Sequence, residues 1–370
     1  MEANIRGIIT VDYEPSTKRG GQERSLFDVV KGFRKEGIPV ILAYCVYGDL
    51  VPIYESLGVV TVLIPRINIF KKGSITQWKE FYSSITRISK VSPLRPAIYL
   101  NQIMDLPLGV GLKYALKAKS LTVHLRLPPV GQALKGRMNQ LSLMKHCVDH
   151  FIVATTNMQH AHSTSGVPEN KIAIIPNGFW FDEMTIPAHA AENNPIKITY
   201  LGRIDKSKGV DEIIDALKLV KERGYQFDFS IAGGTMNSTQ VAYKRELEDQ
   251  IERLNLTQEV TFVGHKNDPV EYFTHYDLTI FSSTWNESFG RVLVESIVAG
   301  TPVIGKNVGS VAEILNDMEL KWIYSSVEDL AQKIIQFMNS KNYEIEQKQN
   351  YMLKRYDLNT IIHAIIQLTN

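Results

Sequence analysis

Residues 286–305, NESFGRVLVESIVAGTPVIG, decide how this chain folds, together with the apolar run LTIF at 278–281 just before them. The apolar run predicts a buried parallel strand, and the following residues have the periodicity of a helix that ends at Gly300, before a second short strand. A strand, loop, helix and strand in this order build an open α/β sheet, which binds ligands beyond the carboxyl ends of its strands. There the first turn of the helix offers unpaired backbone N–H groups and a positive dipole end, so the stretch predicts a ligand site as well as a fold.

Two kinds of residue in this stretch suit a ligand. Ser288 and Gly290 are small, so an anionic group can approach the backbone closely. Glu287 and Glu295 fall within roughly 80° of each other if both lie on one helix. Two carboxylates beside an anion repel it unless they hold something else, and sugar hydroxyls are their natural partners. An amphipathic surface helix with two solvated glutamates explains the spacing equally well, so spacing alone leaves both interpretations open.

Composition favours a soluble protein of two domains. The chain has 370 residues, of which 44% are hydrophobic and 22% charged, enough for each domain to bury its own core. Its longest apolar runs are strand-sized, so we expect no membrane span, and Arg6 and Asp12 interrupt the pattern of a signal peptide. Two cysteines, Cys45 and Cys147, predict core thiols in a reducing cytoplasm, without a disulfide framework.

Charge is unevenly distributed along the chain, although the net charge is only +2. Between Arg66 and Arg137 there are 13 basic and 2 acidic residues, a local net charge of +11 that leaves −9 for the rest. Aromatic residues lie among these charges, namely Phe70, Trp78, Phe81 and Tyr82. An interfacial helix on an anionic membrane is one interpretation, and a solvated face balanced by an acidic second domain is the other. No recognised nucleic-acid-binding module is present, which argues against nucleic acid as the partner.

The first half of the chain has two further candidates at strand ends. Gly20 and Gly21 separate a predicted strand at 5–10 from a predicted helix at 23–35, where they permit close approach to the backbone. His124 lies at the end of a predicted strand, 121–125, from which it can contact a ligand, although a lone histidine is more often structural.

We predict no metal site. Four histidines are close in sequence, His146, His150, His160 and His162, but no cysteine or carboxylate completes a convincing ligand set. The chain also lacks an Asp-x-Asp motif, so a metal-dependent donor site has no obvious ligands. Side chains and helix dipoles are then expected to neutralise an anionic ligand.

A second cluster opens the other half of the chain. The predicted strand at 196–201 leads into a glycine-bounded loop that contains Arg203 and Lys208. Arginine presents a planar fork of donors and lysine a point charge, so together they can neutralise a leaving pyrophosphate. Solvated loop charges are the alternative. Gly233 and His265 follow two further predicted strands, 227–232 and 260–263, at the same edge of the sheet.

The chain resembles retaining glycosyltransferases of family 4 in their acid-x7-acid signature. The matching residues are Glu287 through Glu295, followed by Gly300, Pro302, Gly309 and Glu313. The resemblance implies the GT-B fold, an α/β architecture of two Rossmann-like parallel-sheet domains that face a central cleft. It extends over nearly the whole chain, and Pro176-Asn177-Gly178 matches the family's domain junction. The implied parts are an acceptor-side domain at 1–180, a linker at 181–195, a nucleotide-sugar-binding domain at 196–350 and a terminal helix within 351–370 that crosses back.

The resemblance also implies roles for individual residues. Arg203 and Lys208 would neutralise the diphosphate, Glu295 would hold the ribose hydroxyls, Glu287 would orient the donor sugar, and His124 would contact that sugar. The other implied donor-binding residues are Gly20, Gly21, Gly233, His265, Ser288, Phe289, Gly290, Arg291 and Val292. The acceptor side would include Glu23 and Arg126. Where the family has an acid directly after the histidine, this chain has Leu125 and Arg126, which leaves the local electrostatics open.

The function implied is retaining, metal-independent transfer of a hexose to a glycan or lipid-linked acceptor, with UDP-sugar favoured over GDP-sugar as donor. Front-face transfer, in which the leaving phosphate takes the acceptor proton, would account for retention. Two rivals are a nucleotide-sugar epimerase of the same fold and a sugar-nucleotide-binding scaffold without turnover. No G-x-G-x-x-G follows any predicted strand, which argues against a nicotinamide enzyme. We expect a cytoplasmic protein that can be peripheral on the membrane.

Overall fold

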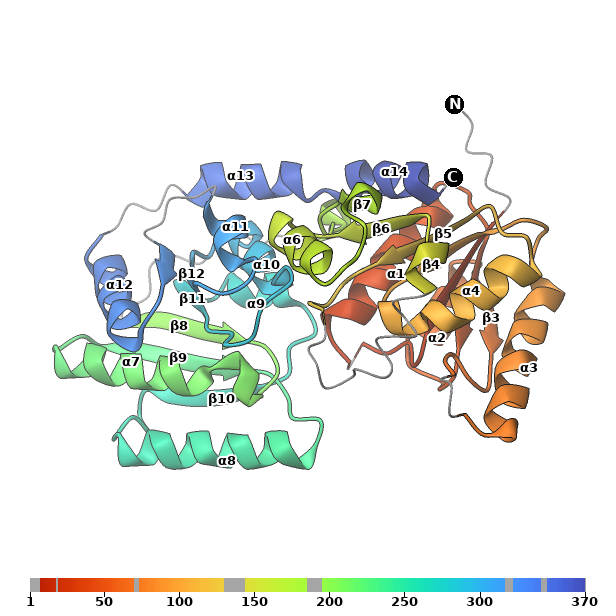
Figure 1. Cartoon of the computed structure of the whole chain (residues 1–370). Coiled ribbons are helices and arrows are strands. Elements are labelled where there is room, and N and C mark those ends of the chain that lie inside the picture. Colours follow the sequence, from red (N-terminus) through yellow and green to blue (C-terminus); the bar gives the residue numbers. More distant parts are fainter. Residues whose placement is uncertain are drawn as a thin grey trace. The chain divides into compact units, whose positions relative to one another are not determined.

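The chain forms two compact units, each with its own parallel sheet (Figure 1). Our computed structural model describes residues 7–17, 19–69, 73–129, 144–184, 195–316, 322–340 and 345–369. Unit 1 comprises Met1–Trp180 and Tyr356–Asn370, and unit 2 comprises Phe181–Arg355. Of the expected linker at 181–195, residues 185–194 lie outside the described residues.

Unit 1 is built on a seven-stranded sheet in the order β3-β2-β1-β4-β5-β6-β7. Its strands are β1 (Ile8–Asp12), β2 (Val40–Tyr44), β3 (Val60–Leu63), β4 (Ala97–Leu100), β5 (Ser120–His124), β6 (His150–Val153) and β7 (Ile172–Ile174). The strand order reverses at β1, where Ile9 is in register with Ile41 of β2 on one side and with Ile98 of β4 on the other. In an open sheet, ligands bind at such a reversal.

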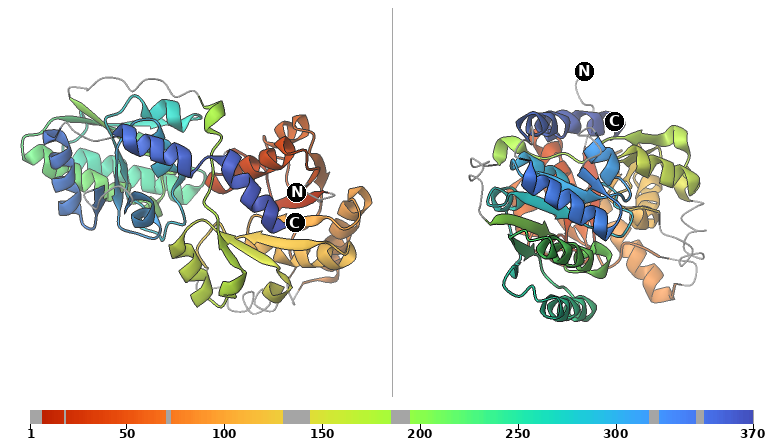
Figure 2. Two further views of the ribbon diagram at one scale, coloured as in Figure 1. Left: turned by 90° about the horizontal axis from the view of Figure 1, so that it is seen from above. Right: turned by 90° about the vertical axis from the view of Figure 1, so that its left-hand side faces the viewer.

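Helices cover both faces of this sheet because successive side chains along a strand point to opposite faces (Figures 1 and 2). Ile9 and Val11 join one core, whereas Ile8 joins the other. The first core is completed by α3 (Ile75–Val91), α4 (Leu106–Ala115) and α6 (Thr156–Thr164), and the second by α1 (Gly21–Lys35), α2 (Val51–Ser56) and α14 (Leu358–Thr369). Coverage of both faces explains why β1, β2, β4 and β5 are buried along their whole length.

Unit 2 is built on a six-stranded sheet in the order β10-β9-β8-β11-β12-β13. Its strands are β8 (Ile196–Leu201), β9 (Phe227–Ala232), β10 (Val260–Gly264), β11 (Leu278–Phe281), β12 (Val303–Lys306) and β13 (Ile323–Tyr324). The order reverses at β8, where Ile198 is in register with both Phe229 of β9 and Leu278 of β11. The loops after β8 and β11 therefore leave the sheet side by side.

The helices of unit 2 also fall into two groups. One core contains residues of α7 (Val210–Glu222), α8 (Ser238–Arg253) and α12 (Val327–Asn339). The remaining helices are α9 (Pro269–Phe273), α10 (Arg291–Val298), α11 (Val311–Asn316) and α13 (Ile345–Arg355), and α10 packs on the other three. The sequence-based bounds of β8, β9 and β11 agree with the structure.

The expected single terminal helix is wrong, because the structure has α13 and α14 with a break between them. At the break, the Phe179 N–H donates to the Tyr356 carbonyl and the Leu358 N–H donates to the Phe179 carbonyl, each at 2.9 Å. Backbone groups that would continue a helix are thus paired with another segment. The Asp357 carboxylate accepts the backbone N–H of the second residue of α14 and so starts the new helix. The division into units follows this break, and α14 packs on α1 (Figure 2).

Candidate functional site

In unit 2 the candidate site lies beyond the carboxyl ends of β8 and β11, at the reversal of strand order. The helices after β8 and β11 both start at a left-handed glycine, Gly209 for α7 and Gly290 for α10. α10 is capped by Gly290, which is in the left-handed conformation and has no side chain to accept a backbone hydrogen bond. In contrast, α8 and α9 are capped by the side chains of Asn237 and Asp268. α10 therefore begins without a side-chain cap, an arrangement that allows an anionic ligand close to the helix start.

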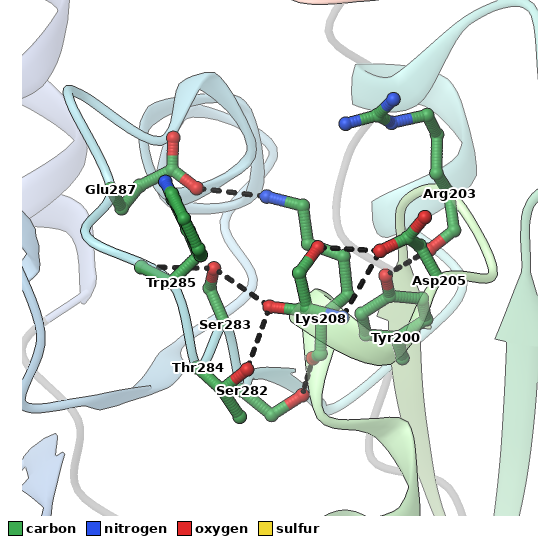
Figure 3. Close-up of polar contacts among 10 residues, drawn as sticks. Tyr200, Arg203, Asp205, Lys208, Ser282, Ser283, Thr284, Trp285 and Glu287 are labelled. Carbon is green, nitrogen blue, oxygen red and sulfur yellow. Dashed lines mark hydrogen bonds and ion pairs between the residues drawn. The ribbon is translucent and has the colours of Figure 1, made fainter. Parts of the chain in front are cut away.

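The loop after β8 is held by its own hydrogen bonds (Figure 3). The Asp205 carboxylate accepts from the Ser207 N–H at 3.0 Å and hydroxyl at 2.6 Å, and from the Gln240 amide at 3.0 Å. The Ser207 hydroxyl is the main cause that holds the pKa of Asp205 below its usual value. Gly209, at φ 61°, ends the loop, and a Cβ there would lie 2.4 Å from the Ser282 carbonyl oxygen. Only glycine therefore allows the two loops to approach this closely.

The loop after β11 binds directly to the loop after β8. The Ser282 hydroxyl donates to the Lys208 carbonyl at 2.7 Å. The Thr284 N–H and hydroxyl both donate to the Ser207 carbonyl, at 2.9 and 3.1 Å. These bonds fix the backbone of Lys208 relative to the loop that contains Glu287 (Figure 3).

Lys208 and Glu287 form an ion pair between these loops, with 2.9 Å between Lys208 Nζ and Glu287 Oε2. Both side chains are largely buried. Arg203 differs, because its exposed guanidinium makes no hydrogen bond or ion pair with any residue that the structure describes, and Figure 3 shows it separate from the pair. Its backbone is nevertheless held, since the Tyr200 hydroxyl donates to the Arg203 carbonyl at 2.8 Å. Among the described residues, Lys208 is thus paired, whereas the guanidinium of Arg203 is available to a ligand.

The expectation that Glu287 and Glu295 share one helix is wrong. α10 begins at Arg291, so Glu287 lies in the preceding loop and the angle calculated for a continuous helix does not apply. Glu295 is on α10, is buried, and pairs with Arg291 one turn earlier at 3.5 Å. The left-handed Gly290 between the two acids breaks the helical path.

A turn at Gly309, after β12, packs against the same loop. Gly309 has φ 55°, and a Cβ there would lie 2.4 Å from both the N and O atoms of Glu287. The Ser310 N–H donates to the Glu287 carbonyl at 2.8 Å. The turn at Gly309 therefore positions the backbone of Glu287, and Lys208, in the loop after β8, holds its carboxylate.

The other predicted donor-binding residues of unit 2 have varied environments. His265 is exposed just after β10, and Ser288 and Val292 are half-buried beside the start of α10. The Phe289 side chain is buried in the protein, so only its backbone can face a ligand. Gly233 has a packing role, because a Cβ there would lie 1.8 Å from the Gly202 carbonyl oxygen.

In unit 1 the predicted glycines open α1 after β1. Gly20 is the N-cap of α1 at φ 136°, has open space around it, and supplies no capping side chain, while Gly21 is the first helical residue. Glu23, in the first turn, forms an ion pair with Arg19 at 3.2 Å. Arg19 also pairs with Glu14 at 3.0 Å. Charge at this helix start is thus already partly compensated.

His124 and Arg126 belong to a buried hydrogen-bonded cluster at the ends of β4 and β5. His124 Nδ1 lies 2.7 Å from the Tyr99 hydroxyl, and burial, helped by the nearby charge of Arg126, holds the pKa of His124 well below its usual 6.5. The Arg126 guanidinium donates to the side chains of Asn101, at 2.9 Å, and Asn177, and to the Tyr99 hydroxyl at 3.3 Å. Sequence reasoning missed Tyr99, which is indistinguishable in the sequence from a core residue of β4.

Two buried acids at the same edge of unit 1 were also missed. Asp12 ends β1 and Asp105 follows β4, and each has a carboxylate oxygen without a hydrogen-bond partner among the described residues. Burial raises the pKa of Asp12 to about 6, and burial also raises that of Asp105 well above its usual value, with a further contribution from Asp12. A carboxyl that directly ends an apolar strand is the signal that could have revealed Asp12.

The aromatic residues of the basic segment 66–137 differ in their exposure on α3. Ile75, Trp78 and Tyr82 are 78, 48 and 72% exposed, whereas Phe81 is buried in the core, so the expectation that Phe81 joins a surface is wrong. Exposed residues three and four apart lie on one side of a helix. Lys79 is exposed next to them, and Phe70 lies outside the described residues. Within the described ranges, no helix combines the length and hydrophobicity needed to cross a bilayer.

The histidines considered for metal lie on three different elements, with only His160 and His162 together, on α6. His146 lies in the 3₁₀ turn Lys145–Cys147, His150 begins β6, and His162 is buried on α6 with its ring against the Leu127 carbonyl at 3.0 Å. Among the described residues, no three His, Cys, Asp or Glu side chains gather as metal ligands. Both cysteines are half-buried and free.

Two Rossmann-like parallel-sheet units, each with polar loops at its reversal of strand order, define the GT-B class of fold. Two family models match the chain, "Glycosyltransferase Family 4" over residues 19–180 and "Glycosyl transferases group 1" over residues 182–354. The chain therefore belongs to the family 4 glycosyltransferases of GT-B fold.

Similar proteins agree with this assignment. The chain is 26% identical over 212 residues to the capsular polysaccharide biosynthesis glycosyltransferase CapM of Staphylococcus aureus, covering 53% of this chain and 54% of CapM. It is 22% identical over 335 residues to the phosphatidylinositol N-acetylglucosaminyltransferase gpi3 subunit of Schizosaccharomyces pombe, covering 84% of this chain and 68% of that protein. The chain spans about half the length of CapM and of two other curated relatives that it matches.

Solved structures share the fold. The chain superimposes on Anabaena HepE in complex with UDP and glucose with a TM-score of 0.81 at 21% identity, and the match covers 98% of each chain. TarM has a TM-score of 0.80 at 12% identity, with both chains fully covered.

Proposed function

We propose that this protein is a retaining, metal-independent glycosyltransferase that moves a hexose from a UDP-sugar to a glycan or lipid-linked acceptor. The observation that carries the proposal is the group formed by Arg203, Lys208 and Glu287 beyond β8 and β11, beside the glycine-capped start of α10. Two cations can balance a diphosphate, and the carboxylate accepts sugar hydroxyls. The UDP complexes of HepE and the role of CapM in polysaccharide synthesis support this choice of donor and pathway class.

The proposed chemistry places charge stabilisation on the leaving group. As the bond between the sugar and the diphosphate breaks, Arg203 and Lys208 stabilise the developing charge on the phosphate oxygens. Glu287 and the N–H groups from Ser288 to Gly290 orient the sugar, Glu295 holds the ribose hydroxyls, and His124 contacts the transferred sugar. The leaving phosphate takes the acceptor proton on the same face, which retains the configuration. In this mechanism the side chains of Arg203 and Lys208 take the place of a metal ion, so a chelator should leave the rate of transfer unchanged.

The first test is a thermal-shift panel of UDP, GDP, ADP and their common sugar conjugates, with and without a chelator. We expect UDP and one UDP-sugar to raise the unfolding temperature equally in both conditions, because a ligand that binds only the folded state stabilises it. No shift with any nucleotide would contradict the donor site. Incubation with the donor alone then separates a transferase from an epimerase, since only an epimerase alters the donor sugar without an acceptor.

We also propose that unit 1 contacts an anionic lipid surface through the α3 face, which we define as Ile75, Trp78, Lys79, Tyr82 and Lys90. The apolar members are exposed on one side of the helix and the two lysines lie beside them. The neighbouring acid, Glu80, is already paired with Arg66 at 2.8 Å, so it does not cancel the lysines. Aromatic rings together with lysines are the composition that binds at a lipid interface.

Sedimentation with liposomes tests the α3 face. Vesicles that contain anionic lipid should pull the protein down at low salt and release it at high salt, since exposed charges are screened. The double variant Trp78→Ser, Tyr82→Ser should bind several-fold less, whereas Val241→Ser, an exposed apolar position on α8, should bind like the wild type. Equal binding by all variants would assign the membrane contact elsewhere, and no binding at low salt would remove it.

A further inference from the structure

The environment of His124 determines which of its ring nitrogens carries the proton. Nδ1 lies 2.7 Å from the Tyr99 hydroxyl, and Nε2 has no hydrogen-bond partner among the described residues. Both side chains are buried, and their rings meet edge to face with centroids 6.1 Å apart. The hydrogen bond is therefore shielded from water, and its direction is set by the protein around it.

Arg126 sets that direction. A guanidinium can only donate, so the Tyr99 oxygen must be the acceptor of the 3.3 Å bond from Arg126 Nη2. The one hydrogen of the Tyr99 hydroxyl is then left to point at His124 Nδ1. The reverse arrangement, with the hydrogen on Nδ1, would leave the buried Tyr99 hydroxyl hydrogen without an acceptor in addition to leaving Nε2 unpaired, and buried polar groups rarely stay unpaired.

Arg126 is itself held in place, so the direction is built into the fold. Its Nε donates to the Asn101 side chain at 2.9 Å, and Nη1 donates to the side chain of Asn177, in the Pro-Asn-Gly junction. Asn101 in turn donates to the Gln22 carbonyl in the first turn of α1, at 3.0 Å. β4, β5 and α1 therefore all contribute to the orientation of one imidazole.

We propose that Tyr99 and Arg126 are positioning residues that hold His124 as the neutral tautomer protonated at Nε2, so that it presents a hydrogen-bond donor to an oxygen of the transferred sugar. In this role His124 accepts no proton during the reaction. The low pKa that burial and Arg126 impose on His124 agrees with a neutral ring. The identity of the ligand oxygen rests on the proposed function, whereas the tautomer does not. The arrangement also gives a role to Arg126, which lies two residues after His124.

Long-range ¹H–¹⁵N NMR of ¹⁵N-histidine-labelled protein tests the tautomer directly, with His124→Asn used to assign the signals. We expect His124 to show a protonated Nε2 and an unprotonated Nδ1 across neutral pH. In Tyr99→Phe the ring loses the hydroxyl that fixes it, so the two nitrogens should move toward averaged shifts. Tyr54→Phe is the matched control, because it removes a buried hydroxyl that has no partner among the described residues. A protonated Nδ1 in the wild type, or a Tyr99→Phe spectrum like that of the wild type, would overturn the proposal.

Kinetics give the second measurement. Tyr99→Phe should lower kcat/KM about 10-fold, as loss of one orienting hydrogen bond does, whereas Tyr54→Phe should leave kcat/KM unchanged. Unfolding temperatures of both variants show whether a general loss of folding explains the result. If the expected NMR signature is present but no nucleotide sugar is turned over, the proposed function fails and the tautomer assignment stands. If nucleotide sugar is turned over but Nδ1 is protonated, the tautomer assignment fails and the proposed function stands.

Discussion

At the scale of single residues, Arg203 is the clearest test of the donor site. Arg203→Gln should lower kcat by roughly 10² to 10³, because the variant loses a cation that acts on the developing phosphate charge. The unfolding temperature should hardly change, since the guanidinium makes no hydrogen bond or ion pair with the described residues. Steady-state kinetics and thermal unfolding measure the two effects.

The matched control is Arg223→Gln, an exposed arginine at the C-cap of α7. This variant removes the same charge from the same unit. The loop after β8 precedes α7, so Arg223 lies at the opposite end of that helix. If both variants lose activity equally, the effect is one of overall charge, and Arg203 has no specific role.

Glu287 gives a prediction in which binding and turnover change in opposite directions. Its carboxylate lies 2.9 Å from Lys208 Nζ and so competes with a diphosphate for that cation. Glu287→Gln should therefore bind UDP about threefold more tightly, while transfer falls because the sugar loses its carboxylate partner. Calorimetry with UDP and a transfer assay measure the two effects. Weaker UDP binding by Glu287→Gln would show that the ion pair positions Lys208 and does not compete with the ligand.

Sequence reasoning selected candidate residues but could not predict their surroundings. Arg203, Lys208 and Glu287 were selected from loops after apolar runs, and the structure brings Lys208 and Glu287 into contact. Their hydrogen-bonding environment could not be predicted, because the bonds of Ser282 and Thr284 to the loop after β8 join residues about 75 positions apart. Such contacts depend on sheet order, which local patterns do not encode.

At the scale of elements, the turn at Gly309 is predicted to control the loop that contains Glu287. Gly309→Ala adds a Cβ that would lie 2.4 Å from the backbone N and O atoms of Glu287, and it also strains a left-handed residue. We expect a loss of about 2–4 kcal/mol in the unfolding free energy of unit 2, together with weaker UDP binding. Urea unfolding and calorimetry measure these quantities.

Gly224→Ala separates strain from contact. Gly224 has φ 85°, but nothing lies within 4 Å of a Cβ placed there, so its substitution costs only the left-handed conformation, about 1 kcal/mol. Gly309→Ala should therefore be the more harmful change, and only it should affect UDP binding. Equal effects of the two variants would mean that the packing against Glu287 does not matter.

The elements themselves were largely predictable, because buried parallel strands are continuous apolar runs and those of β8, β9 and β11 have sharp ends. The exception was the pair α13 and α14. Residues 351–368 have no proline or glycine to mark a helix end, and the break depends on hydrogen bonds with Phe179, far away in the sequence. The late start of α10, at Arg291, was missed for a different reason, since a left-handed glycine can either end a helix or precede one.

At the scale of the whole molecule, buried titratable side chains of unit 1 make the unfolding free energy depend on pH. The pKa of Asp12 is raised by burial from 3.8 to about 6, so the folded state binds a proton that the unfolded state has already released between these values. A group with a raised pKa stabilises the fold below its unfolded pKa, and this contribution is lost as pH rises through the folded value. Asp105 acts in the same direction, whereas the lowered pKa values of His124 and His162 destabilise the fold as pH falls below 6.5.

Because these contributions oppose each other in the total, Asp12 must be isolated by comparing Asp12→Asn with the wild type. A shift of about two pKa units corresponds to about 3 kcal/mol, so the variant should gain that much unfolding free energy relative to the wild type between pH 4 and pH 7. The measurement is urea unfolding monitored by the hydrogen exchange of peptides from β1 and β4, because these peptides report on unit 1 alone. If the difference in unfolding free energy between variant and wild type is constant from pH 4 to pH 7, the Asp12 carboxyl ionises in the fold as it does in the unfolded chain. The surroundings of Asp12 would then be hydrated.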